Sequence, residues 1–118
     1  MTTIIVLFNL KSGVSRSAYE AWAKETDLKT VRALNSIDRF DVFESMGLLG
    51  SDAKPPYEFI EVLEVNDMGV FREETGTDTM GAVAQQFQGF ADNPLFILTE
   101  NIEAVSYTHL TLPTTPYV

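Results

Sequence analysis

The chain has 118 residues, of which 45% are hydrophobic and 21% charged, and this is the size and composition of one globular domain. Seventeen acidic residues against eight basic ones give a net charge of −9, which repels phosphate backbones and anionic lipids, so we expect neither nucleic acid nor a membrane as partner. The absence of cysteine excludes disulfides, thiolate catalysis and sulfur-ligated metals, and is compatible with a cytoplasmic location.

The first predicted element is a strand over Ile4 to Leu10, which is apolar at both odd and even positions. A strand of this kind is buried on both faces. After a short turn, Ser15 is expected to cap a helix, and Ser17 with Glu20 offers an alternative capping box.

Tyr19, Trp22 and Ala23 share one side of this helix, because they recur at the i, i+3, i+4 spacing. Thr26-Asp27 has the composition of a second helix cap. The apolar positions from Leu28 to Leu34 therefore belong either to a separate short helix or to a bent continuation.

The middle of the chain returns to a period of two. Asp38 to Leu48 is predicted as the second strand and Tyr57 to Val65 as the third, a central strand. The Gly/Pro-rich loop Gly47 to Pro56 joins them, and its two prolines prevent a helix from running into the third strand.

Asn66-Asp67 predicts the cap of a short helix that Gly76 ends. A longer helix is expected from about Thr77, with apolar residues at helical spacing. Asn93-Pro94 is expected to stop it, and Leu95 to Ile102 is predicted as the fourth strand.

The last segment, Ser106 to Val118, has two prolines and no periodicity like that of its neighbours. We interpret residues 1 to 105 as the domain and residues 106 to 118 as a non-native tail, similar to tails found where a gene model runs into foreign sequence. His109 is the only histidine, so the expected domain contains none.

The order strand, helix, strand, strand, helix, strand predicts an α+β fold of the ferredoxin-like kind, with a four-stranded antiparallel sheet and both helices on one face. The other face would expose apolar side chains, at about 25 cal/mol for each Å² left in water. A homodimer in which two sheets face each other, a dimeric α+β barrel, would cover it.

Four segments carry a family resemblance: TIIVLFNLKSGVSRSAYEAWAKETDL, TVRALNSIDRFDVF, GLLGSDAKPPYEFIEVLEVNDM and FADNPLFILTENI. Together they resemble the REDY-like (HapK) family of the dimeric α+β barrel superfamily, over roughly residues 3 to 103. The likeness extends over the whole domain and contains no short catalytic signature.

The resemblance implies a small-molecule role in secondary metabolism. The family is associated with the assembly of red tripyrrole pigments such as prodigiosin, and the superfamily includes cofactor-free monooxygenases, cyclases and EthD-like proteins. Because many members occur outside pigment gene clusters, the resemblance does not imply a pyrrole substrate.

Glu61 is the candidate catalytic residue. It stands in the third strand between Phe59 and Leu63 on one face, where burial would raise its pKa toward the range of a general base. Without a core histidine or cysteine, a base must be a carboxylate, a tyrosine or a lysine. The alternative is that Glu61 pairs with a basic residue such as Arg39.

Candidate substrate-binding residues surround this position. They are Asn9, Tyr19, Trp22, Asp41, Tyr57 and Phe59. The aromatic members could form pocket walls and donate hydrogen bonds, or could be ordinary core. Asn9 and Asp41 are polar residues within strands, which could line a pocket or face solvent.

No motif for a cofactor or metal is present, so we expect no cofactor and no metal site. The acidic residues Glu58, Glu64, Glu73 and Glu74 are interpreted as a solvated face. Two functions remain: a cofactor-independent enzyme acting on a hydrophobic or aromatic metabolite by cyclisation, condensation or oxygenation, and a carrier that binds such a molecule without chemistry.

Overall fold

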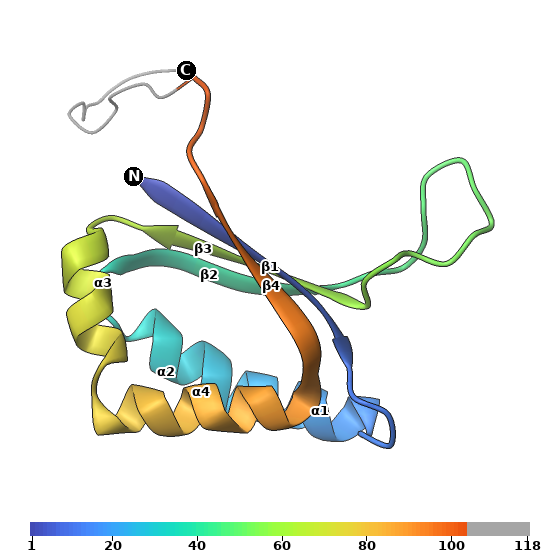
Figure 1. The fold of residues 1–118 in the computed structure, drawn as a ribbon, viewed down its shortest axis with the longest axis horizontal. Coiled ribbons are helices and arrows are strands. Elements are labelled where there is room, and N and C mark those ends of the chain that lie inside the picture. The colour runs from blue at the N-terminus through green and yellow to red at the C-terminus, as the bar shows by residue number, and fades with distance from the viewer. Residues whose placement is uncertain (104–118) are drawn as a thin grey trace.

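A computed structural model describes residues 1–103 and comprises one four-stranded antiparallel sheet with its helices on one face (Figure 1). The strand order is β2-β3-β1-β4. The elements are β1 (Thr2–Leu10), α1 (Arg16–Trp22), a π-helical turn (Ala23–Asp27), α2 (Leu28–Arg32), β2 (Ile37–Glu44), β3 (Phe59–Val65), α3 (Met68–Thr75), α4 (Asp78–Phe90) and β4 (Ala91–Thr99). The predicted α+β ferredoxin-like fold is confirmed.

Three helices begin after a side chain that caps them, and two of these caps, Ser15 and Asp67, were predicted from the sequence. The Ser15 side chain accepts a hydrogen bond from the Ala18 backbone N–H, and Asp67 and Thr77 cap α3 and α4 in the same way. Each cap satisfies a backbone donor that has no partner within its helix.

The predicted start of the fourth strand is wrong. β4 begins at Ala91, directly after α4, and ends at Thr99. Asn93 has a φ of +46°. Leu95 pairs with Leu7 and Asp92 with Asn9, so β4 has one residue more than β1 between these two pairs, which is a β-bulge. Because β4 is an edge strand with a bulge here, it accommodates Asn93 and Pro94, which the sequence pattern predicted to end the helix.

The second strand is also shorter than predicted, because β2 ends at Glu44. The chain from there to β3 forms a long loop that projects away from the body of the protein (Figure 1). The boundary predicted at residue 105 and the tail from Ser106 lie outside the described residues.

The core lies between the sheet and the helices. Ile4, Val6 and Phe8 of β1 are buried on this side. The Phe8 ring packs edge-on against Tyr19 and Phe87, with centroids 5.6 and 4.9 Å away. Aromatic pairs of this geometry contribute roughly 0.5 to 1.5 kcal/mol beyond the area they bury.

The opposite face of the sheet has no helix over it (Figure 1). Strand pairing aligns two rows of side chains across this outer face: Phe43, Ile60, Leu7 and Leu95, and then Asp41, Val62, Ile5 and Ile97. Seven of these eight residues are apolar, and Phe43, Leu95 and Ile97 are 46%, 45% and 43% exposed. Among the described residues, no helix is long and apolar enough to span a membrane.

Candidate functional site

Glu61 lies in the middle of the inner, helix-covered face of the sheet. In β3, positions alternate between buried and half-buried, and Glu61 falls on the buried side with Phe59 and Leu63. Its neighbours across the strands are Val6 and Val42. The residue is only 5% exposed, so a carboxyl group stands among apolar side chains.

The helix opposite β3 supplies two more polar groups. Tyr19, Ala23, Asp27 and Val31 are buried at successive spacings of four residues. A regular α-helix would rotate such positions progressively out of the core, but the π-helical turn Ala23–Asp27 holds about 4.4 residues per turn and keeps them in line. Asp27 is therefore 5% exposed and faces the sheet side of the helix.

The prediction of Asp27 as a helix cap is wrong. The helical conformation continues through residues 23 to 32, and the Asp27 side chain makes no capping hydrogen bond. The bent continuation, the second of the two predicted possibilities, is the one present, and the π-helical turn is the bend. π-Helical turns often occur at functional sites.

Burial perturbs all three groups. Desolvation raises the pKa of the Glu61 carboxyl to about 8, with a further contribution from Asp27. Burial alone raises the pKa of Asp27 to about 7. The pKa of the Tyr19 phenol is raised far above its usual range, first by burial and then by the nearby Glu61 and Asp27 carboxyls.

The Tyr19 hydroxyl and the Glu61 Oε2 atom are both buried without a hydrogen-bond partner. The two side chains are nevertheless close enough for each to shift the pKa of the other. A buried polar atom without a partner costs roughly 1 to 3 kcal/mol, so both groups gain from a hydrogen bond, either between the Tyr19 hydroxyl and Glu61 or to a bound polar molecule.

The alternative of an ion pair between Glu61 and Arg39 is wrong. The Arg39 Nε atom lies 2.6 Å from Asp41, and its Nη1 atom lies 3.7 Å from Glu64, on the other face of the sheet. No cation contributes to the pKa of Glu61 or of Asp27.

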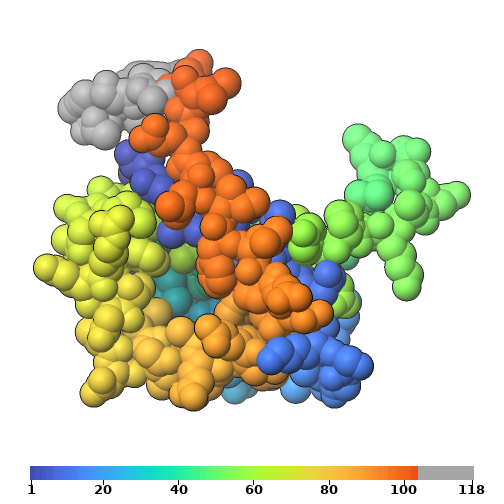
Figure 2. Space-filling view, in the orientation of Figure 1, coloured from blue at the N-terminus to red at the C-terminus, as the bar shows by residue number. Residues whose placement is uncertain are grey.

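A cavity of about 140 Å³ reaches Asp27 and Glu61 from the β4 side. Its apolar lining includes Val31, Phe40, Leu63, Met80, Val83 and Phe87. Figure 2 shows the surface hollowed between α4 and β4, where the cavity opens, and Phe96 of β4 is one of its lining residues. The buried carboxyl groups are thus accessible to a small molecule.

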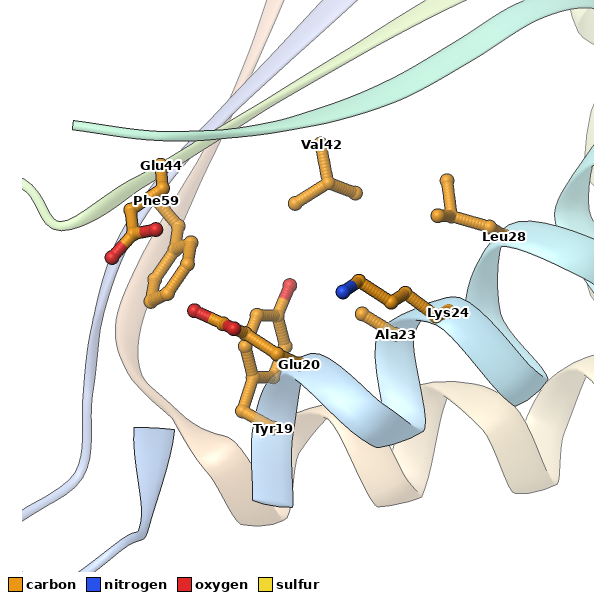
Figure 3. A pocket seen from close by; sticks show the side chains of 8 residues that line it. All are labelled: Tyr19, Glu20, Ala23, Lys24, Leu28, Val42, Glu44 and Phe59. Atoms are coloured by element: carbon orange, nitrogen blue, oxygen red, sulfur yellow. The ribbon is translucent and has the colours of Figure 1, made fainter. Parts of the chain in front are cut away.

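A second cavity, of about 220 Å³, lies on the β2 side between α1 and the sheet (Figure 3). Tyr19 and Phe59 are among its lining residues, with Glu20, Lys24 and Glu44 supplying charged groups. In Figure 3 the Tyr19 hydroxyl points from the helix toward the sheet. Since Tyr19 lines this cavity and Glu61 the other, the Tyr19–Glu61 pair stands between the two.

The structure brings together Tyr19, Phe59 and Glu61 of the predicted site residues. Tyr19 and Phe59 have ring centroids 4.8 Å apart. Trp22 is set to one side: its indole Nε1 donates to Gln86 Oε1 over 2.7 Å, and its ring packs against Phe90.

Asn9, Asp41 and Tyr57 lie apart from this group. The Asn9 side chain donates to the Pro56 carbonyl and accepts from the Glu58 N–H, which fastens the chain at the start of β3. Asp41 belongs to the outer face and pairs with Arg32 and Arg39. Tyr57 precedes β3 and lines neither cavity.

Three of the four residues predicted to form a solvated acidic face make ion pairs or hydrogen bonds near the surface, and Glu64 lies 3.7 Å from Arg39. Glu58 accepts from the Leu10 N–H and pairs with Arg16, 2.8 Å away. Glu74 accepts from the backbone N–H groups of Asn35 and Ser36. Within residues 1–103, no group of three or more histidine, cysteine or acidic residues is arranged to hold a metal ion.

Asp27 is the residue that sequence reasoning missed. A signal for it was present, because Asp27 follows Tyr19 and Ala23 at the same spacing of four residues. The residue types Thr26-Asp27 favoured a helix cap instead. The π-helical turn, which keeps residues at this spacing on the buried side of the helix, has no sequence signature.

Comparison with known proteins identifies a family and several structures that are similar to this chain. The family described as REDY-like protein HapK matches residues 2–102. The crystal structure of HapK from Hahella chejuensis is 30% identical, covers 87% of this chain and 94% of its own, and superposes with a TM-score of 0.69. A search of curated protein sequences found no match.

More distant structures share the fold. A dimeric ferredoxin-like protein of unknown function from Thermobifida fusca is 16% identical, with a TM-score of 0.67 over 83% of this chain and 88% of its own. A mutant of SnoaB, a cofactor-independent oxygenase from Streptomyces nogalater, is 12% identical, with a TM-score of 0.66 over 86% of this chain and 93% of its own.

Fold and site together define the class: a ferredoxin-like α+β protein of the kind found in dimeric α+β barrels, with buried carboxyl groups between helices and sheet. Within that class, the chain belongs to the REDY-like HapK family.

Proposed function

We propose that this protein binds a hydrophobic or aromatic metabolite between its helices and its sheet, and that Glu61 transfers a proton there in a cofactor-free cyclisation, condensation or oxygenation. The observation that carries the proposal is the Glu61 carboxyl group, which is only 5% exposed, has no cation beside it and lines an apolar cavity. A carboxyl with a pKa of about 8 can both accept and donate a proton near neutral pH.

The binding residues of this proposal are Tyr19 and Phe59, which accompany Glu61. Trp22 is assigned a supporting role, since it packs behind Tyr19 with ring centroids 6.0 Å apart. Asn9, Asp41 and Tyr57 are not included, because the first two are engaged elsewhere and the third lines neither cavity.

Membership in the HapK family supports a role in secondary metabolism, of the kind associated with prodigiosin-type pigments. The likeness to SnoaB, whose name describes a cofactor-independent oxygenase, is one of fold. It supports the proposal only in that such a fold accommodates chemistry without a cofactor.

We also propose that the protein is a homodimer in which two outer faces meet. Its support is the open face, where seven apolar residues from all four strands gather. The dimeric ferredoxin-like protein from Thermobifida fusca has the same fold.

The test is a panel of pyrroles, indoles and phenols, each incubated with the protein without added cofactor. Binding and consumption are measured for wild type, for Glu61→Gln and for Glu73→Gln, a control in which the altered carboxyl is exposed on α3. We expect Glu61→Gln to retain binding and to lose roughly 100-fold or more in rate, as general acid–base catalysis requires.

Binding without consumption by the wild type would instead favour the non-catalytic carrier. Failure of every member of the panel to bind would contradict the proposed function.

A further inference from the structure

The Glu61 carboxyl has a second carboxyl group beside it, Asp27, for which the reaction proposed above has no role. Both residues are 5% exposed and both line the cavity of about 140 Å³. Asp27 contributes to the pKa of Glu61, so the two groups interact.

Two buried carboxylates without a cation cannot both stay ionised near neutral pH. Removing each charge from water costs several kcal/mol, and the like charge of its neighbour adds to that cost. Arg16, Arg32 and Arg39 are paired with other acidic residues and do not offset it.

No other titratable side chain around Asp27 and Glu61 gives up a proton more readily than these two carboxyl groups do. From α1, Tyr19 faces Glu61, and its pKa is raised. Glu20, Lys24 and Glu44 line the other cavity. The side chains that α4, β1 and β4 place beside the pair are uncharged, among them Val83, Gln88, Val6 and Phe96.

The cavity also indicates the size and charge of its ligand. Its volume of about 140 Å³ is close to the roughly 150 Å³ of an enclosed apolar cavity that takes up benzene, so the part of a ligand that lies inside this open cavity is about one six-membered ring. An anion is opposed by the carboxyl pair and by the net charge of −9.

We propose that Asp27 and Glu61 act as one carboxyl pair that holds a single proton at neutral pH, and that the pair recognises neutral single-ring molecules with an N–H or O–H donor beside an acceptor. The protonated carboxyl donates to the acceptor of the ligand and its other oxygen accepts from the donor. Asp27 is a positioning residue, since its negative charge keeps the proton on Glu61. The inference rests on the proposed binding function and adds the ligand class and the second residue.

The test uses three single-ring probes: 2-pyridone, which is neutral and has an N–H beside a carbonyl; toluene, which has the same size without polar groups; and benzoate, which is an anion. Dissociation constants are measured by NMR on the intact chain, from the cavity methyl groups of Met80 and Val83, at a series of pH values.

We expect 2-pyridone to bind the wild type at least tenfold more weakly at about pH 10 than at about pH 6, because both carboxyls are then ionised and the donor is lost. Toluene binding should change much less, and benzoate should bind more weakly than 2-pyridone throughout. Glu61→Gln should remove most of the pH dependence, because an amide keeps a donor and an acceptor at every pH, and only the titration of Asp27, whose pKa is about 7, remains.

Asp27→Asn is the decisive variant, because it should move the midpoint of the 2-pyridone profile to lower pH by about one unit while Glu73→Gln leaves it in place. If Asp27→Asn does not fold by circular dichroism, Asp27→Ala takes its place. A midpoint that stays in place when Asp27 is changed overturns the pair and leaves the proposed function standing.

Two other results would also overturn the inference. Benzoate binding as tight as that of 2-pyridone would mean that the pair does not oppose anions. Failure of both toluene and 2-pyridone to bind would contradict the proposed function together with the pair.

Discussion

The two faces of the sheet come from the same four strands but differ in what they carry. The inner face is covered by helices and holds a buried carboxyl, Glu61, where a simple core would have an apolar residue. The outer face is apolar, and Phe43, Leu95 and Ile97 remain more than two-fifths exposed. A buried carboxyl group and an exposed apolar surface both raise the free energy of the isolated chain, and each indicates an unmet partner: a small molecule inside and a second copy outside.

The largest expected effect comes from replacing a phenylalanine by alanine on each face of the sheet and comparing the losses in the free energy of unfolding. Phe8→Ala should lower the free energy of unfolding by about 3 to 5 kcal/mol, because the Phe8 ring is fully buried among Tyr19, Phe59 and Phe87. Phe43→Ala on the outer face should cost less than half as much and should act on dimer dissociation instead. Urea unfolding of both variants at one protein concentration measures this, and equal losses would contradict the distinction.

The next effect concerns assembly. Ile97→Asp places a charge on the outer face, in the edge strand β4 and opposite Ile5 of β1. Because a charge in an apolar interface is costly, we expect the dimer dissociation constant to rise by about 100-fold. Light scattering coupled to gel filtration gives the mass of wild type and variant, with Leu49→Asp in the exposed loop as control. A wild-type monomer, or a variant that stays dimeric, would contradict the role of this face.

Glu61→Gln tests the inner face through stability. The pKa of Glu61 is raised in the folded state, so the folded protein binds more protons than the unfolded chain between about pH 4.5 and about pH 8. Stability therefore falls as the pH rises through this window. At about pH 8, Glu61→Gln should raise the free energy of unfolding by about 1 to 3 kcal/mol and flatten its pH dependence. Thermal melts at several pH values measure it, and a loss of stability would indicate a structural ion pair instead.

The smallest effect concerns the helix that carries Tyr19 and Asp27. The Ser15 side chain accepts from the Ala18 N–H at the start of α1. Ser15→Ala should cost about 1 kcal/mol of unfolding free energy, whereas Ser12→Ala in the preceding turn should cost almost nothing. Melting temperatures of the two variants are compared. An equal effect of both would mean that this cap does not anchor the helix.

The inner face could be predicted from the sequence where strand periodicity decides it. In β3, alternate residues must point to opposite sides, so burial of Phe59 and Leu63 also implies burial of Glu61. The regular α-helical period did not predict the burial of Asp27, because the helix is not regular at this point. In a regular α-helix, Asp27 would be turned by about 80° from Tyr19, and the π-helical turn removes this offset.

Asn9 and Asp41, two predicted site residues that lie outside the site, have partners at very different distances along the chain. Asn9 is engaged by Pro56 and Glu58, which lie nearly fifty residues further along the chain. Asp41 is engaged by Arg32, which reaches it from the end of α2. The Asn9 contacts leave no pattern in the local sequence, whereas Arg39, two residues before Asp41 in the same strand, was a local signal that Asp41 is paired.

Titration of the Glu61 carboxyl in the wild-type protein tests the central claim most directly. The side-chain carboxyl carbon of Glu61, assigned by comparison with Glu61→Gln, is followed by ¹³C NMR across the pH range. The structure predicts a midpoint near a pKa of about 8, well above the usual 4.5, because the group is desolvated beside Asp27. A midpoint near 4.5 would mean that Glu61 is solvated or paired with a cation, and would contradict its assignment as a buried proton-transfer group.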